Sequence, residues 1–244
     1  MGHIQDMKIA IIGYGKMGKA IEAIALERGH EIPLKLGSEN ANDFDMDLLA
    51  SCDVAIEFSR PESAAKNIEK CIQASVPVVV GTTGWYDQYD RLSKAVKDAN
   101  TALLAATNFS VGVNLFFALN KKLAELMSDQ SDYKASMTEI HHLQKLDSPS
   151  GTAITLAEGL IENHPEYSKW VNEASSQSEV LPIISEREAE VPGTHIVKYE
   201  SEIDSIEITH LAKSRKGFAL GAVIAAEFLK DKEGIYNMKD VLNI

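Results

Sequence analysis

The pattern of apolar and polar positions changes part-way along the chain. In the first part, short apolar runs alternate with stretches in which apolar residues recur at helical spacing. The pattern predicts strands at 8–12, 31–36, 53–58, 76–80 and 101–106, with helices after the first strand and near 61–74 and 87–99. Near-continuous apolar strands separated by amphipathic helices indicate a parallel sheet covered on both faces. We therefore expect an α/β fold with a doubly wound, Rossmann-type parallel sheet.

The later part of the chain predicts an inserted α+β domain. Helices are expected there over 111–127 and about 150–163, and strands over 134–142, 194–200 and 203–211, the last two as an antiparallel pair. A closing helix is expected over 218–229, after the inserted domain. Residues 168–192 are polar with few periodic features, and we expect an extended excursion there. The predicted domains are thus 1–108 plus 217–244, and 109–216.

Composition limits the class of partner. The chain has 244 residues and a formal net charge of −12, so it would repel nucleic-acid phosphates and we expect no nucleic-acid partner. No apolar run reaches the ~18 residues that span a bilayer, and the first residues lack the pattern of a signal peptide. Cys52 and Cys71 form no C-x-x-C pair. We therefore expect a cytoplasmic protein with no membrane partner.

A glycine-rich loop follows the first predicted strand and opens the first predicted helix. It reads Gly13-Tyr14-Gly15-Lys16-Met17-Gly18. The first glycine permits a tight turn, the second lets the backbone approach a pyrophosphate, and the third allows close packing of helix on strand. The helix N-terminus adds unpaired N–H groups and partial positive charge. This context predicts dinucleotide binding by the first domain; the alternative is that the glycines serve only a tight turn.

Three further segments are expected at the same cofactor site. They are Gly81, Thr82 and Thr83 after the fourth strand, Ala106, Thr107, Asn108 and Phe109 after the fifth, and Ser38 and Glu39 after the second. Ligands bind at this carboxyl edge of open α/β sheets. Glu39 lies at about the right distance to reach a ribose hydroxyl, and a solvated carboxylate is the alternative. No arginine is adjacent to clamp a phosphate, so the sequence leaves the choice between NADH and NADPH open.

The segment 139–152 gathers imidazoles, an ammonium group and a helix start. His141 and His142 would face opposite sides of a strand, and the rest of the chain offers no Cys/His cluster with ligand spacing, so we expect no metal site. Lys145 can neutralise a carboxylate or deliver a proton. Ser150-Gly151-Thr152 at a helix N-terminus is suited to hold a carboxylate. The alternative is a capped helix with two surface histidines.

Together these segments resemble the dihydrodipicolinate reductase (4-hydroxy-tetrahydrodipicolinate reductase) family of bacterial lysine and diaminopimelate synthesis. The matching pieces are the glycine loop, EFSRPE at 57–62, GTTG at 81–84, NFSVGVN at 108–114, E-x-H-H-x-x-K-x-D-x-P-S-G-T at 139–152, VPGT at 191–194, and Ser214-Arg215 before Phe218-Ala219. They occur in family order over nearly the whole chain, and the run at 139–152 is highly specific.

The resemblance implies an NAD(P)H-dependent oxidoreductase that reduces 4-hydroxy-tetrahydrodipicolinate to tetrahydrodipicolinate. It implies that His141 is the acid–base residue and that Lys145 is the proton donor. The residues implied to bind the two carboxylates of this small dicarboxylate are His142, Ser150, Gly151, Thr152 and Arg215. It also implies a homotetramer built through the sheet of the inserted domain, so that 109–216 would serve both substrate binding and oligomerisation.

Two other functions stay open. Another Rossmann-fold dehydrogenase of the aspartate pathway, if it acted on an aldehyde, would need a cysteine nucleophile in a polar, cationic setting, which neither cysteine has. A non-catalytic nicotinamide-binding sensor would keep the glycine loop but would have no use for Lys145 beside His141. His195 and His210 lie on the late strands, where we expect structural or interface roles rather than catalysis.

Overall fold

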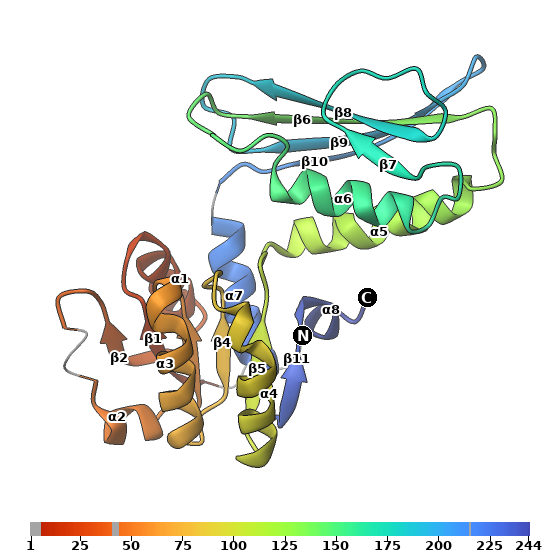
Figure 1. The fold of residues 1–244 in the computed structure, drawn as a ribbon. Coiled ribbons are helices and arrows are strands. Elements are labelled where there is room, and N and C mark those ends of the chain that lie inside the picture. The colour runs from red at the N-terminus through yellow and green to blue at the C-terminus, as the bar shows by residue number, and fades with distance from the viewer. Residues whose placement is uncertain (1–5, 41–43, 215) are drawn as a thin grey trace. The chain divides into compact units, whose positions relative to one another are not determined.

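The chain forms two compact units in a computed structural model that describes residues 6–40, 44–214 and 216–244. The first unit runs from the N-terminus to Val111 and resumes over Lys216–Ile244, and the second is Gly112–Arg215 (Figure 1). These boundaries lie near those expected from the sequence, while the ligands that each unit binds remain predictions.

A parallel sheet with helices on both faces makes up the first unit. Its strand order is β11-β5-β4-β3-β1-β2. The strands are β1 (Lys8–Ile12), β2 (Glu31–Leu36), β3 (Val54–Glu57), β4 (Val78–Val80), β5 (Ala102–Ala105) and β11 (Gly234–Tyr236). The chain steps to one side of β1 to form β2 and to the other side to form β3, so the order reverses at this point. Ligands of doubly wound folds bind where the order reverses.

Two apolar cores cover the two faces of this sheet. Ile9 and Ile11 pack with α1 (Lys16–Glu27), α7 (Lys216–Leu229) and α8 (Met238–Leu242). Ala10 and Ile12 point to the opposite face, because successive residues of a strand alternate. The helices on that face are α2 (Met46–Ala50), α3 (Pro61–Gln73) and α4 (Tyr89–Asp98), with a short 3₁₀ helix, η1 (Tyr86–Gln88), before α4. Figure 1 shows α3 and α4 on one side of the sheet and α1 and α7 on the other.

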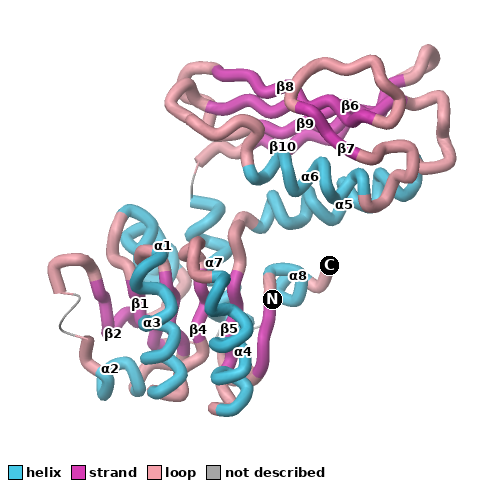
Figure 2. Tube along the Cα trace, viewed as in Figure 1, coloured by secondary structure: helices cyan, strands magenta, loops and turns pink. Residues whose placement is uncertain are grey.

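The second unit is a mixed sheet with the order β10-β9-β6-β8-β7. Its strands are β6 (Lys134–His141), β7 (Lys169–Val171), β8 (Val180–Arg187), β9 (Thr194–Glu200) and β10 (Ser205–Leu211). The helices α5 (Val111–Met127) and α6 (Gly151–Ile161) lie along one face of this sheet (Figure 2). The pairing of β9 with β10 is antiparallel, as the alternation of their residues predicted.

The expectation of a polar excursion over 168–192 was wrong. This segment contains β7 and the eight-residue β8, which pairs with β6 in the interior of the sheet. Leu181 and Ile183 are fully buried in the helix-side core, but Pro182 and Ile184 on the other face are also apolar. The strand therefore shows no apolar–polar alternation, and a proline argues against an interior strand. The missing alternation and the proline explain why this strand was not predicted from the sequence.

Three short elements were also missing from the sequence prediction, namely α2, β11 and α8. Each spans three to five residues, which is too short for a helical or strand period to be recognised. Among the described residues, no helix is long and apolar enough to cross a bilayer.

Candidate active site

The glycine loop has two crowded positions and one open position. A Cβ placed on Gly13, whose φ is +104°, would lie 2.1 Å from the carbonyl oxygen of Phe58. A Cβ on Gly18 would lie 2.4 Å from the carbonyl oxygen of Gly13. A Cβ on Gly15, the N-cap of α1, would have no atom within 4 Å among the described residues. The protein itself therefore requires glycine at 13 and 18, whereas Gly15 opens a space at the helix N-terminus.

Phe58 joins the loops at the carboxyl edge of the sheet. It follows β3, and a Cβ on Gly81, after β4, would come within 2.1 Å of its ring. The rings of Phe58 and Phe109, after β5, lie 5.5 Å apart between centroids and are tilted by 54°. The loops after β4 and β5 thus meet at the Phe58 ring, and the glycine loop meets the Phe58 backbone. The sequence had marked Phe58 only as part of a family motif, because packing between loops leaves no local pattern.

The end of β2 lies against the glycine loop. The backbone N–H groups of Gly13 and Tyr14 both donate to the carbonyl oxygen of Leu36 at 2.8 Å. Ser38 and Glu39 are both exposed in the bend that follows. The glycine loop, predicted to hold the pyrophosphate, and the bend at 38–39, predicted to hold the adenosine ribose, are therefore neighbours.

The loop after β4 carries a buried polar group. The Thr82 hydroxyl is buried and has no hydrogen-bond partner in the described part of the chain, while Trp85 fixes the loop by donating from Nε1 to the Thr82 carbonyl oxygen at 2.7 Å. Thr83 and Thr107 are exposed, and Ala106 and Asn108 are half-buried. Buried hydroxyls are normally hydrogen-bonded, so a ligand that bonds to Thr82 fits this edge.

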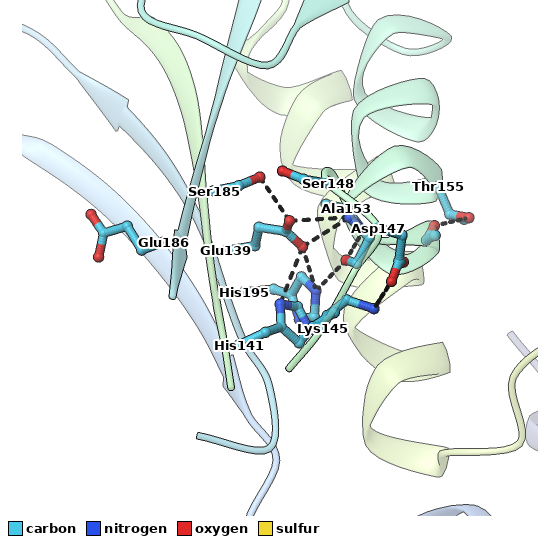
Figure 3. Close-up of polar contacts among 12 residues, drawn as sticks. Glu139, His141, Lys145, Asp147, Ser148, Ala153, Thr155, Ser185, Glu186 and His195 are labelled. Carbon is cyan, nitrogen blue, oxygen red and sulfur yellow. Dashed lines mark hydrogen bonds and ion pairs between the residues drawn. The ribbon is translucent and has the colours of Figure 1, made fainter. Parts of the chain in front are cut away.

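In the second unit, a buried carboxylate is the centre of a polar cluster (Figure 3). Glu139 lies on β6 with its side chain 1% exposed. Both of its oxygens lie 3.1 Å from the backbone nitrogen of Ser150, and Oε1 accepts from the Ser185 hydroxyl at 2.7 Å. Burial raises the pKa of Glu139, but the hydrogen bonds from Ser150 and Ser185 outweigh it and hold the pKa below the usual value. Glu139 is therefore ionised at neutral pH.

Two imidazole rings contact this carboxylate. His141, two residues along β6 on the same face, places Nδ1 3.3 Å from Oε2 of Glu139, and His195 on β9 places Nε2 3.8 Å from the same oxygen. The rings meet edge to face, with centroids 5.1 Å apart. Burial lowers the pKa of His141 against the opposing charge of Glu139, and burial lowers the pKa of His195 to about 4. Both rings are neutral at pH 7.

The loop between β6 and α6 carries a positively charged side chain, that of Lys145. The Lys145 ammonium lies 2.8 Å from both carboxylate oxygens of Asp147, and this contact lowers the pKa of Asp147. Arg187 at the end of β8 donates from Nη2 to the Asp147 carbonyl oxygen at 2.8 Å. Figure 3 shows Lys145 between the histidines and Asp147. An ammonium and a guanidinium therefore lie beside a helix start and can attract an anion.

The start of α6 is shaped to receive a carboxylate. The Ser150 hydroxyl accepts from the Ala153 N–H at 3.2 Å and lies 3.1 Å from Nε2 of His195. Gly151 and Thr152 are the first helical residues, and their N–H groups have no partner within the helix. No described atom lies within 4 Å of a Cβ placed on Gly151. The positive end of the helix thus opens onto free space.

Two further residues, His142 and Arg215, were predicted to bind the substrate. His142 is half-buried just after β6, and its buried Nδ1 has no hydrogen-bond partner among the described residues. Arg215 lies outside the described residues.

The structure brings together residues that the sequence did not. Glu139, His141 and His195 each offer a ligand atom within 4.8 Å of the others, as a metal site would require. The expectation of no metal considered His141 with His142, and it missed the same-face neighbour at 139 and a partner from β9. Hydrogen bonds from Ser150 and Ser185 already use the Glu139 oxygens, so a metal-free site stays the prediction.

Comparison with known proteins decides the family. Family models for dihydrodipicolinate reductase match the chain, the N-terminal model over residues 7–109 and the C-terminal model over residues 112–242. The chain belongs to the dihydrodipicolinate reductase family. A curated 4-hydroxy-tetrahydrodipicolinate reductase from Christiangramia forsetii is 53% identical over 241 residues, which cover 97% of this chain and 98% of the relative. Another from Neisseria gonorrhoeae is 32% identical and covers 98% of both chains.

A solved structure of this reductase family shares the fold. Dipicolinate-bound dihydrodipicolinate reductase from Paenisporosarcina sp. TG-14 matches with a TM-score of 0.77 at 21% identity, over 96% of this chain and 98% of that one. The predicted fold class, a Rossmann-type parallel sheet with an inserted α+β domain, is confirmed, and so is the family resemblance drawn from the sequence motifs.

Proposed function

We propose that this reductase-family member converts 4-hydroxy-tetrahydrodipicolinate to tetrahydrodipicolinate with NADH or NADPH, in lysine and diaminopimelate biosynthesis. The full-length match to relatives of that name supports the proposal. The observation that carries it is the segment from Glu139 to Thr152. It combines a neutral imidazole, an ammonium group and an open helix N-terminus, which is what the protonation and binding of a dicarboxylate require.

The first unit fits a dinucleotide cofactor. The space at Gly15 and the N–H groups at the start of α1 would receive the pyrophosphate. Ser38 and Glu39 would contact the adenosine ribose. The proposed contacts on the nicotinamide side are Gly81, Thr82, Thr83, Ala106, Thr107, Asn108 and Phe109. When bound, the reduced nicotinamide supplies a hydride.

The second unit would bind the dianionic substrate and manage protons. Lys145 and the α6 N–H groups neutralise carboxylates, with His142, Ser150, Gly151, Thr152 and Arg215 as the remaining proposed contacts. The net reaction adds one hydride and one proton to the substrate and releases one water. Lys145 carries a proton that it can donate, and His141, neutral at pH 7, can accept one and return it.

We also propose a cytoplasmic homotetramer. The helices α5 and α6 lie on one face of the second sheet, and no described helix of that unit lies on the other (Figure 2). Half-buried apolar residues stand on that second face, including Ile140, Ile184 and Ile196. Packing of sheets from two copies would bury them.

The two alternative functions are less compatible with the side chains. An aldehyde dehydrogenase needs a reactive thiolate, but Cys52 and Cys71 are both buried. Burial raises the pKa of Cys52 to about 11, and it raises that of Cys71 further. A cofactor sensor without catalysis does not explain Lys145 beside a neutral His141.

A coupled assay tests the proposal. Dihydrodipicolinate synthase supplies the unstable substrate, and the absorbance of NADH or NADPH is followed. We expect oxidation that depends on this reductase and on the synthase. No oxidation with either cofactor, or oxidation with aspartate semialdehyde alone, would contradict it.

A further inference from the structure

Glu139 is buried and ionised, although its position on β6 faces an apolar core. Met137, two residues earlier on the same face, is 2% exposed and packs in that core. Burying a carboxylate is unfavourable unless its oxygens are hydrogen-bonded. An apolar side chain would fill such a position without that requirement, so the carboxylate calls for a reason beyond packing.

The contacts of Glu139 join the two ends of one loop. Its oxygens accept from the Ser150 N–H at 3.1 Å, eleven residues further along the chain, and Ser150 in turn caps α6 through its hydroxyl. The residues between them include His141, His142 and Lys145, which carry the proposed chemistry. Glu139 therefore closes the base of the segment that holds the catalytic groups and fixes the helix start against β6.

The same carboxylate also sets the direction of the His141 ring. The buried Nδ1 of His141 lies 3.3 Å from Oε2 of Glu139, although it makes no hydrogen bond within the described residues. A carboxylate is negatively charged and only accepts hydrogen bonds, so at this distance it favours the tautomer with its proton on Nδ1. Nε2 then carries the lone pair, and the Cβ that Gly193 lacks would come within 3.1 Å of it. A glycine at 193 keeps this side of the ring open.

We infer, on the basis of the proposed function, that Glu139 is a positioning residue that holds the His141 ring and the carboxylate-binding start of α6 in one fixed arrangement. Glu139 does not touch the substrate. It acts through His141, whose free nitrogen it orients, and through Ser150, whose backbone it anchors. Ser185 supports it from β8 with a hydrogen bond of 2.7 Å.

The charges that face His141 predict a distinctive pH response. Glu139 on β6 and Asp147 in the loop favour the protonated ring, while Lys145 in the loop and Arg187 on β8 oppose it. The neutral ring of His195 on β9 completes the surroundings. Removing the Glu139 charge therefore lowers the pKa of His141 further, and the acidic limb of the rate profile should move to lower pH.

The test is Glu139→Gln in the coupled assay, with Glu186→Gln as the matched control. Glutamine keeps the shape and an acceptor for Ser150 but lacks the charge. Glu186 is an exposed carboxylate on β8, and Figure 3 shows it pointing away from Glu139. For the glutamine at 139 we expect kcat to fall roughly 10- to 100-fold, less than the 10²–10⁴ of a lost acid–base group, with the cofactor KM unchanged. The control should keep the wild-type kcat and pH profile.

The outcomes separate the two proposals. If the wild type is active and Glu139→Gln has the same kcat and pH profile, the role of Glu139 is overturned but the proposed function is not. An inactive wild type would overturn the proposed function as well. A fall in kcat without a shift of the acidic limb would indicate a merely structural effect and would also overturn it. If the glutamine variant does not fold, Glu139→Asp decides. This shorter carboxylate should lower kcat but retain the acidic limb, and a wild-type kcat would overturn the inference.

Discussion

Gly15 and Gly18 lie in one loop, yet the structure predicts opposite consequences for replacing them with alanine. At Gly18, the new Cβ would lie 2.4 Å from the Gly13 carbonyl oxygen and 3.3 Å from a methyl carbon of Ile11. The backbone must move to relieve the first contact, and overpacking of this kind destabilises by about 1–3 kcal/mol. Since 1 kcal/mol shifts the Tm of a chain this long by about 2–4 °C, Gly18→Ala should lower Tm by about 2–12 °C.

At Gly15, the same methyl group enters space that no described atom occupies. The backbone is extended, with φ −88° and ψ −153°, and does not lie in the left-handed region that favours glycine, so Gly15→Ala should change stability by about 0.5 kcal/mol or less. The methyl would instead meet the pyrophosphate. Loss of one hydrogen bond to a charged group is worth about 1.5–3 kcal/mol, so the Kd for NADH should rise roughly ten- to a hundredfold.

Thermal unfolding without cofactor and fluorescence titration with NADH measure the two effects separately. Unfolding must be followed without cofactor, because bound ligand itself raises Tm. If Gly15→Ala binds NADH as tightly as the wild type, the pyrophosphate does not lie at this helix start. If Gly18→Ala unfolds at the wild-type temperature, the close packing of α1 on the loop is not as the structure has it.

Four further predictions address the rest of the site. His141→Ala and Lys145→Ala should each lower kcat by roughly 10²–10⁴ with unchanged circular dichroism, and near wild-type rates in both would refute their roles. Pyridine-2,6-dicarboxylate, a planar analogue of the substrate, should inhibit competitively, and Thr152→Val should weaken it roughly tenfold or more, while equal weakening of cofactor binding would point to a folding defect. NADH and NADPH should give kcat/KM values within about tenfold of each other, because no arginine follows the end of β2 closely in the sequence and Lys35 is already paired with Glu22 at 2.9 Å; a preference above about a hundredfold would contradict this. Acid should destabilise the protein between pH 6.5 and about 4, because His195 takes up a proton at higher pH in the unfolded chain than in the folded protein. This difference lowers the free energy of unfolding by roughly 3 kcal/mol at most, and His195→Gln should flatten the pH dependence of the urea midpoint over that range.

A feature of this protein could be predicted from the sequence when the residues that form it are close together in the chain. The glycine loop was recognisable because the strand, the turn and the helix start that give it meaning are consecutive. The same holds for the capped start of α6, where Ser150 bonds to the N–H of Ala153 only three residues later. In both cases the residues that make the feature are close in the chain, so their spacing alone carries the information.

The centre of the second site could not be predicted in this way. Ser185 and Arg187 lie on β8, which showed no alternation, and His195 lies on β9, where a structural role was expected. They reach Glu139 only because β8 and β9 flank β6 in the sheet. Glu139 itself stood in the family motif, but nothing in the sequence distinguished it from a solvent-exposed strand residue. Its burial follows from facing the same side of β6 as Met137.

The distribution of acidic residues explains how a chain of net charge −12 can receive anionic ligands. Four helices, α2, α3, α4 and α8, carry an aspartate or glutamate in the first turn, where it stabilises the positive end of the helix. The helices α1 and α6 carry none, as is also true of α5 and α7, and the starts of α1 and α6 are the proposed pyrophosphate and carboxylate sites. A carboxylate there would stabilise the free helix and repel the ligand. With no carboxylate in its own first turn, each of these helices would gain stability when an anion binds at its proposed site, although Glu139 already accepts from the Ser150 N–H at the start of α6.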